Sequence, residues 1–85
     1  MSMNKPEKTY SIGDVEEILG LPKHRIRHWC DRYLPKVQRI QIGKNVQRRF
    51  TETDIRVIRQ IDRLMARGQT LKSAAEKAHN LYKED

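Results

Sequence analysis

Residues 23–33, KHRIRHWCDRY, gather one lysine, two histidines and three arginines around a single tryptophan. A guanidinium group can donate to guanine O6 and N7 together or to a phosphate, and an imidazole can donate to either acceptor. Like charges on one turn of helix repel each other, so this charge contributes little to folding. The segment therefore indicates an anionic partner.

The composition of the chain limits what that partner can be. Its 85 residues hold 18 Lys and Arg against 11 Asp and Glu, a formal net charge of +7, and this length allows one small domain. No apolar run approaches the roughly 18 residues of a membrane span, and the start, MSMNKPEK, lacks the hydrophobic centre of a signal peptide. The single cysteine, Cys30, agrees with a reducing compartment. We expect a cytoplasmic, nucleoid-associated protein with no membrane partner.

A capping box predicts a helix just before the basic segment. Ser11 and Asp14 have the S-x-x-D spacing, and Gly20 can adopt the left-handed conformation that ends a helix. The expected apolar face consists of Ile12, Val15, Ile18 and Leu19.

The basic segment itself is predicted to form a second helix that ends at Pro35. Its apolar residues recur at i, i+3, i+4 and i+7, namely Ile26, Trp29, Cys30 and Tyr33. Two short helices joined by Gly20-Leu21-Pro22 form a helix-turn-helix, whose second helix fits the roughly 12 Å major groove of B-DNA.

Alternating residues between Lys36 and Phe50 predict an antiparallel hairpin with its turn at Gly43-Lys44-Asn45. A lone hairpin is marginal in water, so we expect it to lean on the helices through Phe50, Ile40 and Ile42. Beside a helix-turn-helix it would act as a wing that lays cations along the flanking backbone or minor groove. We expect the turn and Arg49 to be exposed. Arg48 either follows them or lies against the core.

The rest of the chain reads as two further helices. Thr51 and Asp54 repeat the capping box and open a long helix to Gly68, and a last helix carries its apolar residues on one side. The predicted fold is mainly α, a winged helix-turn-helix of four helices with a two-stranded antiparallel wing. The domain spans residues 10–82, between a flexible basic tail at 1–9 and a short tail at 83–85.

The candidate DNA-binding residues lie on the outward face and flanks of the second helix and along the wing. They are Lys23, His24, Arg25, Arg27, His28, Arg39, Lys44, Arg48 and Arg49. On the third helix, a row of arginines at 56, 59, 63 and 67 is interpreted mainly as a solvated face.

The sequence gives little support for a metal site, a reactive thiol, a base-stacking site or an enzyme active site. His24 and His28 have the i, i+4 spacing of metal ligands, but no carboxylate pair completes a site, so no metal or cofactor is expected. Cys30 and Trp29 are interpreted as core residues rather than a nucleophile or a base-stacking platform. No Ser/His/Asp grouping or phosphate-binding loop is present, so an enzyme is not expected.

Several segments in one order resemble the N-terminal DNA-binding domain of the MerR family. They are YSIGDV (10–15), LGLP (19–22), IRHW (26–29), RRFTETDI (48–55) and LMARG (64–68). The resemblance implies a winged helix-turn-helix that binds double-stranded DNA in transcription regulation. It also implies that Arg27, His28 and Arg48 are the leading contacts. Pro22 stands where a serine cap is frequent in the family, and Cys30 where a glutamate is usual.

The chain ends where family regulators continue into a dimerisation helix and an effector domain, so no effector domain is expected here. Useful affinity is expected to require a homodimer or a tether to a longer protein. Part of the dimer contact would come from Ala75, Ala78, Leu81 and Tyr82 together with the broad apolar face of the third helix. Two alternatives stay open: an architectural, excisionase-like or chromosome-anchoring DNA binder of low base specificity, and a protein-interaction module.

Overall fold

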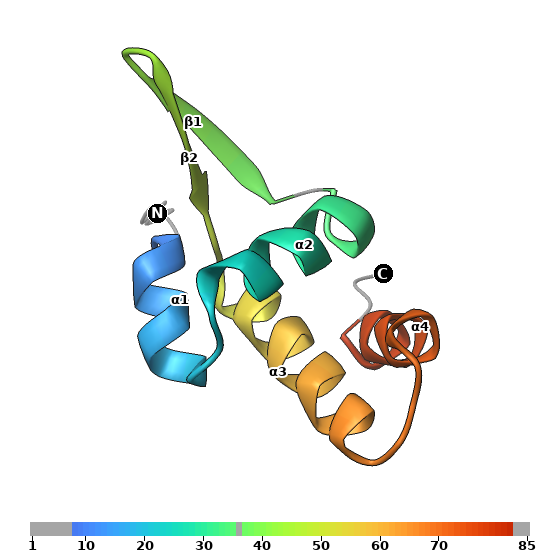
Figure 1. The fold of residues 1–85 in the computed structure, drawn as a ribbon. Helices are drawn as coiled ribbons and strands as arrows, with labels where there is room; N and C mark the ends of the chain where they lie inside the picture. Colours follow the sequence, from blue (N-terminus) through green and yellow to red (C-terminus); the bar gives the residue numbers. More distant parts are fainter. Residues whose placement is uncertain (1–7, 36, 83–85) are drawn as a thin grey trace, which may run out of the picture.

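The computed structural model describes residues 8–35 and 37–82, and Figure 1 shows helices and a hairpin in the predicted order. In this part of the chain the elements are α1 (Ile12–Leu19), α2 (Lys23–Tyr33), β1 (Gln38–Ile42), β2 (Asn45–Arg49), α3 (Glu52–Ala66) and α4 (Leu71–Leu81). The two strands pair antiparallel. A mainly α winged helix-turn-helix is thereby confirmed. The expected tails fall largely on residues 1–7 and 83–85, which lie outside the described residues.

Both predicted capping boxes are present. Asp14 N donates to Ser11 Oγ at 3.1 Å, and Ser11 N donates back to the Asp14 carboxylate at 3.2 Å. Thr51 and Asp54 make the same reciprocal pair at 3.2 and 2.9 Å. Caps of this kind contribute about 1 kcal/mol each, and they define where α1 and α3 begin.

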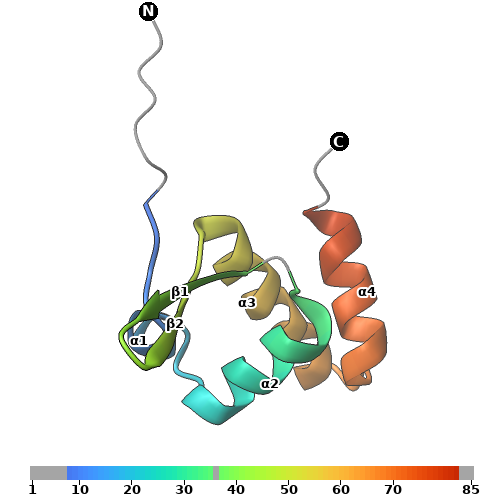
Figure 2. The ribbon, with the colours of Figure 1, turned by 90° about the horizontal axis from the view of Figure 1, so that it is seen from above.

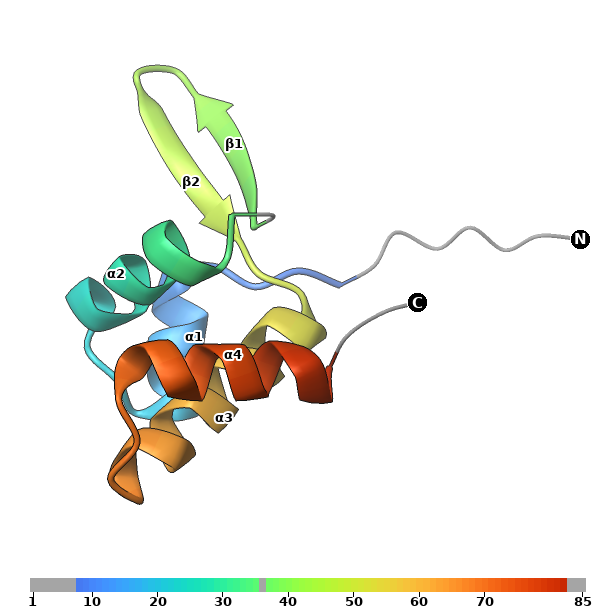
Figure 3. The ribbon, with the colours of Figure 1, turned by 90° about the vertical axis from the view of Figure 1, so that its right-hand side faces the viewer.

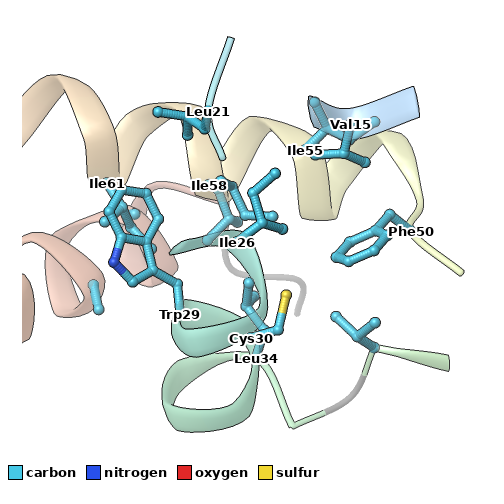
Figure 4. Close-up of a cluster of buried hydrophobic side chains, with 14 of the residues drawn as sticks. Val15, Leu21, Ile26, Trp29, Cys30, Leu34, Phe50, Ile55, Ile58 and Ile61 are labelled. Atoms are coloured by element: carbon cyan, nitrogen blue, oxygen red, sulfur yellow. The ribbon is translucent and has the colours of Figure 1, made fainter. Parts of the chain in front are cut away.

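Phe50 joins the wing to the helices. Its backbone forms an isolated antiparallel bridge with Tyr10, with hydrogen bonds of 2.8 Å in both directions. Its side chain is fully buried beside Val15 of α1 and Ile55 of α3 (Figure 4). The residues just before the two capped helices are therefore held side by side.

The core lies where α2, α3 and α4 meet. Ile26, Trp29 and Cys30 turn inward from α2 and are at most 4% exposed, so the expectation that Trp29 and Cys30 are core residues is confirmed (Figure 4). The α4 helix packs on α3 through small residues, Ala74, Ala75 and Ala78, which are all 0% exposed. Figure 2 shows α4 on the side of the molecule opposite to α1 and the wing.

The burial of α4 corrects the expected dimer contact. Ala75 and Ala78 are enclosed within this chain against α3, so they are not available to a second copy. Leu81, which is 61% exposed, and the half-buried Tyr82 are the members of that set that reach the surface.

The wing does not lean on the helices through its isoleucines, which corrects a second expectation. Ile40 and Ile42 are 45% and 54% exposed, because the hairpin projects away from the helices and only its Phe50 end reaches the core (Figures 1 and 3). Ile18 of α1 is also 46% exposed, so the apolar face expected for that helix is narrower than its pattern suggests.

The hairpin turn is Gly43-Lys44, because Ile42 pairs with Asn45, and Gly43 takes the positive φ of 59° that this tight turn requires.

Because Ile26 is buried and Ile40 is exposed, we expect their replacement to have different effects on the free energy of unfolding. Ile26→Ala should lower the free energy of unfolding by about 2–5 kcal/mol, because it opens a cavity in a closed core. Ile40→Ala should change it by no more than about 0.5 kcal/mol, because the side chain already contacts water. Urea unfolding of both variants measures the difference, and equal losses would contradict the burial described for the wing.

Candidate nucleic-acid interface

The turn between α1 and α2 is secured by a carboxylate. Pro22 is the N-cap of α2 and offers no side-chain hydrogen bond. Instead, Glu16 of α1 accepts a hydrogen bond from the backbone N–H of Lys23 at 3.3 Å. This bond satisfies one of the open donors in the first turn of α2, so the position of α2 depends on α1 as well as on the core.

The cations of α2 point away from the core. Because Ile26, Trp29 and Cys30 are buried, the helical period turns His24, Arg27 and His28 outward, and all three are exposed. Lys23 and Arg25 are exposed as well. The structure thus brings together the five α2 residues predicted as contacts.

Asp31 is the one acidic residue of α2, and it binds both strands of the wing. Its Oδ1 accepts from Arg48 Nη2 at 2.8 Å and from Arg39 Nη2 at 3.2 Å. Arg39 lies directly opposite Arg48 in the hairpin. A single carboxylate thus neutralises part of a pair of like charges that would otherwise repel across the two strands.

The position of Asp31 shows where the wing meets α2. Asp31 follows Arg27 by four residues and His28 by three, so these side chains share one side of the helix. Arg39 and Arg48 therefore meet α2 on its outward side, about one turn beyond the exposed cations. The α2 cations and the base of the wing form one continuous basic surface, which we call the α2–wing surface.

Arg48 is held rather than free. Its side chain is 19% exposed, and within the described residues its Nε is buried without a hydrogen-bond partner. The hydrogen bond from Arg48, together with the charges of Arg48 and Arg39, holds the pKa of Asp31 below its ordinary value of 3.8. Of the two positions considered for Arg48, the one against the body of the protein is therefore observed.

Arg49 departs from its expected exposure. It is half-buried, and it donates from Nε to Thr9 Oγ1 at 3.1 Å and from Nη2 to the Thr9 carbonyl at 3.2 Å. The strand alternation turns Arg49 to the face of the hairpin opposite Arg48, where the segment before α1 passes. Thr9, expected to belong to a loose tail, is tied to the wing by these bonds.

The turn of the wing carries an exposed lysine. Lys44 lies at the tip and is exposed, as predicted. Lys36, the first basic residue expected in the hairpin, lies outside the described residues.

Neither a metal site nor a reactive thiol is found in the described part of the chain. No group of three or more His, Cys, Asp or Glu residues there could hold a metal ion. Burial raises the pKa of the Cys30 thiol from 9.0 to about 12, so the residue stays protonated at neutral pH. A pocket of about 220 Å³ between α1 and α3 has no Ser, Cys or His in its lining.

Sequence reasoning missed the contacts made by two acidic residues, Asp31 and Glu16. An acid at i+4 from Arg27 was a visible signal, but the wing residues that it binds are eight and seventeen positions away. For Glu16 the only signal was a helix that begins at a proline without a side-chain cap.

A winged helix-turn-helix with a basic, outward-facing second helix defines a class of DNA-binding proteins. The sequence model described as MerR HTH family regulatory protein matches residues 10–81, which is most of the chain. The chain belongs to the MerR family, and the family's partner is DNA. No curated protein matches the chain.

Among the described residues no helix is long and apolar enough to cross a membrane.

The bond between Arg48 and Asp31 predicts a change in titration. Arg48→Gln should raise the pKa of Asp31 towards its ordinary value, because the strongest donor to the carboxylate is lost. In the unaltered protein the stability that this ion pair contributes is fully present above the unfolded-state pKa of about 3.9 and is lost as the pH falls through the lower folded-state pKa. NMR titration of the Asp31 carboxyl carbon measures both values. An unchanged pKa in the variant would contradict the pairing.

Proposed function

We propose that this chain binds double-stranded DNA sequence-specifically, as a MerR-like transcription regulator or its DNA-binding domain. In this proposal α2 enters the major groove and the wing lies on the flanking backbone. The observation that carries it is the bond of Asp31 to Arg39 and Arg48, because it joins the wing to the outward side of α2. An exposed basic helix alone would not distinguish a DNA contact from a solvated surface.

The dimensions of α2 suit a groove. Its 11 residues span about 16 Å at 1.5 Å per residue, and its core-facing side is closed off by buried apolar residues. Arg27 can take guanine O6 and N7 with its planar fork, and His24 and His28 can donate to bases or phosphates beside it. We assign base reading to Arg27 first, since it lies one turn before Asp31 on the same side of α2.

In this proposal the wing contacts the phosphates of the DNA backbone, which do not depend on the base sequence. Its strands of five residues each reach about 17 Å and carry Lys44 to the tip. Contacts with phosphates would set the register of α2 along the duplex, from Lys44 directly and from Arg39 where the phosphate shares its guanidinium with Asp31. Arg49 contributes less to this in the proposal, because Thr9 already accepts two of its donors.

A module of this size buries only about 600–1,000 Å² on DNA, so useful affinity calls for a second copy or a tether to a longer protein. Location with the nucleoid belongs to the same proposal.

An architectural role of low base specificity is the second candidate. It is favoured by one observation, the exposure of Ile40, Ile42 and Val46 at 45–55% on the wing. Proteins that bend DNA insert apolar side chains of this type into the minor groove.

The specific proposal predicts a loss on truncation of one arginine. Arg27→Ala should weaken binding to a duplex selected from a random library by about 1–3 kcal/mol with the fold intact. Arg63→Ala removes an exposed arginine in the last turn of α3, outside the α2–wing surface, and serves as the control. Fluorescence titration measures both affinities, and similar effects of the two changes would count against α2 as the reading element.

Salt dependence separates the two candidates. For a specific regulator, the selected duplex should bind about 10³-fold or more tightly than a random duplex at the same salt concentration. For an architectural protein, both affinities should fall steeply and in parallel with salt, at a ratio near one. Failure to bind any duplex at low salt would refute both.

A further inference from the structure

We infer that Asp31 determines the specificity of DNA binding, by holding the wing to α2 and withholding two arginines from indiscriminate phosphate contact. The inference rests on the proposed function and assigns a role to an acidic residue in the middle of a basic surface.

Arg39 and Arg48 are directly opposed across the two strands. Like charges at such a position destabilise a hairpin, and this one has little apolar packing to offset the repulsion, since Ile40 and Ile42 are largely exposed. The Asp31 carboxylate lies between the two guanidinium groups, at 2.8 and 3.2 Å. It therefore stabilises the pairing of the strands as well as their attachment.

Asp31 also sets the position of the wing relative to α2. Within the described part of the chain, the hydrogen bonds from wing side chains to α2 both end on this carboxylate. At its other face, the wing is held to Thr9 through Arg49. Removal of the Asp31 bonds would leave the part of the hairpin beyond the buried Val37 and Phe50 free to move relative to α2.

The same carboxylate competes with DNA. A phosphate that approaches Arg39 or Arg48 must displace Asp31 or share the guanidinium with it, and it is also repelled by the Asp31 charge. Binding driven by phosphates alone is thereby weakened. A duplex with the preferred bases compensates for this loss of affinity through its contacts with α2, provided that the wing keeps its position relative to α2. Asp31 thus lowers binding to random sequence more than binding to the selected site.

The test compares three variants by titration against a selected and a random duplex at several salt concentrations. Asp31→Asn keeps a side-chain oxygen acceptor but removes the charge, and Asp31→Glu restores the charge. Glu76→Gln makes the same change in net charge at an exposed position of α4, which lies across the molecule from the wing, and is the matched control.

Asp31→Asn should bind the random duplex more tightly, with a salt slope steeper by up to about 2 if both arginines gain a phosphate. The ratio of selected to random affinity should fall by about 3- to 10-fold, the scale of two exposed ion pairs. Asp31→Glu should stay close to the unaltered protein. Asp31 is 47% exposed, so the fold should persist, and thermal melting of each variant verifies it.

Two failures are distinguishable in this experiment. If the unaltered chain binds neither duplex, or binds both with equal affinity, the proposed sequence-specific function is refuted, and this inference with it. If the unaltered chain prefers the selected duplex but Asp31→Asn matches Glu76→Gln in slope or leaves the affinity ratio unchanged, the inference alone is overturned.

Discussion

The architecture depends on the constraint imposed at Phe50, where three parts of the chain are held together. The Phe50 backbone pairs with Tyr10 ahead of α1, its side chain is fully buried, and the next residue, Thr51, caps α3. The end of β2, the start of α1 and the start of α3 therefore share one point. Because α2 packs on α3 and is linked to α1 through Glu16, the orientation of the basic helix follows from that junction.

Beyond Phe50 the wing is held mainly by charge. Its buried apolar side chains, Val37 and Phe50, lie at its base, and in the described part of the chain its side-chain hydrogen bonds to α2 both end on Asp31, which is 47% exposed. Such a segment is expected to open locally at a lower free energy than the core. In the proposed function this difference suits DNA binding, because α2, proposed to read the bases, is packed on the core while the wing, proposed to follow the backbone, retains some freedom.

Much of the candidate surface could be predicted from the sequence because it follows from local periodicity. Burial of Ile26, Trp29 and Cys30 at helical spacing places His24, Arg27 and His28 outside, and the structure agrees. The contacts of the wing side chains were harder to predict from the sequence. Two-residue alternation gives two faces for Arg48 and Arg49 but does not say which neighbour covers each face. The structure turns Arg48 to Asp31 and Arg49 to Thr9, contacts between residues 17 and 40 positions apart.

The sequence by itself determined the elements, their order and the family, because caps, turns and apolar periods act over a few residues. It also determined the outward face of α2. Only the tertiary structure decided which charged side chains are held by other parts of the chain, since the partner of a charged side chain depends on how distant segments pack. It likewise decided that the wing isoleucines stay exposed and that the alanines of α4 are buried, because burial belongs to the assembled core and not to the local pattern.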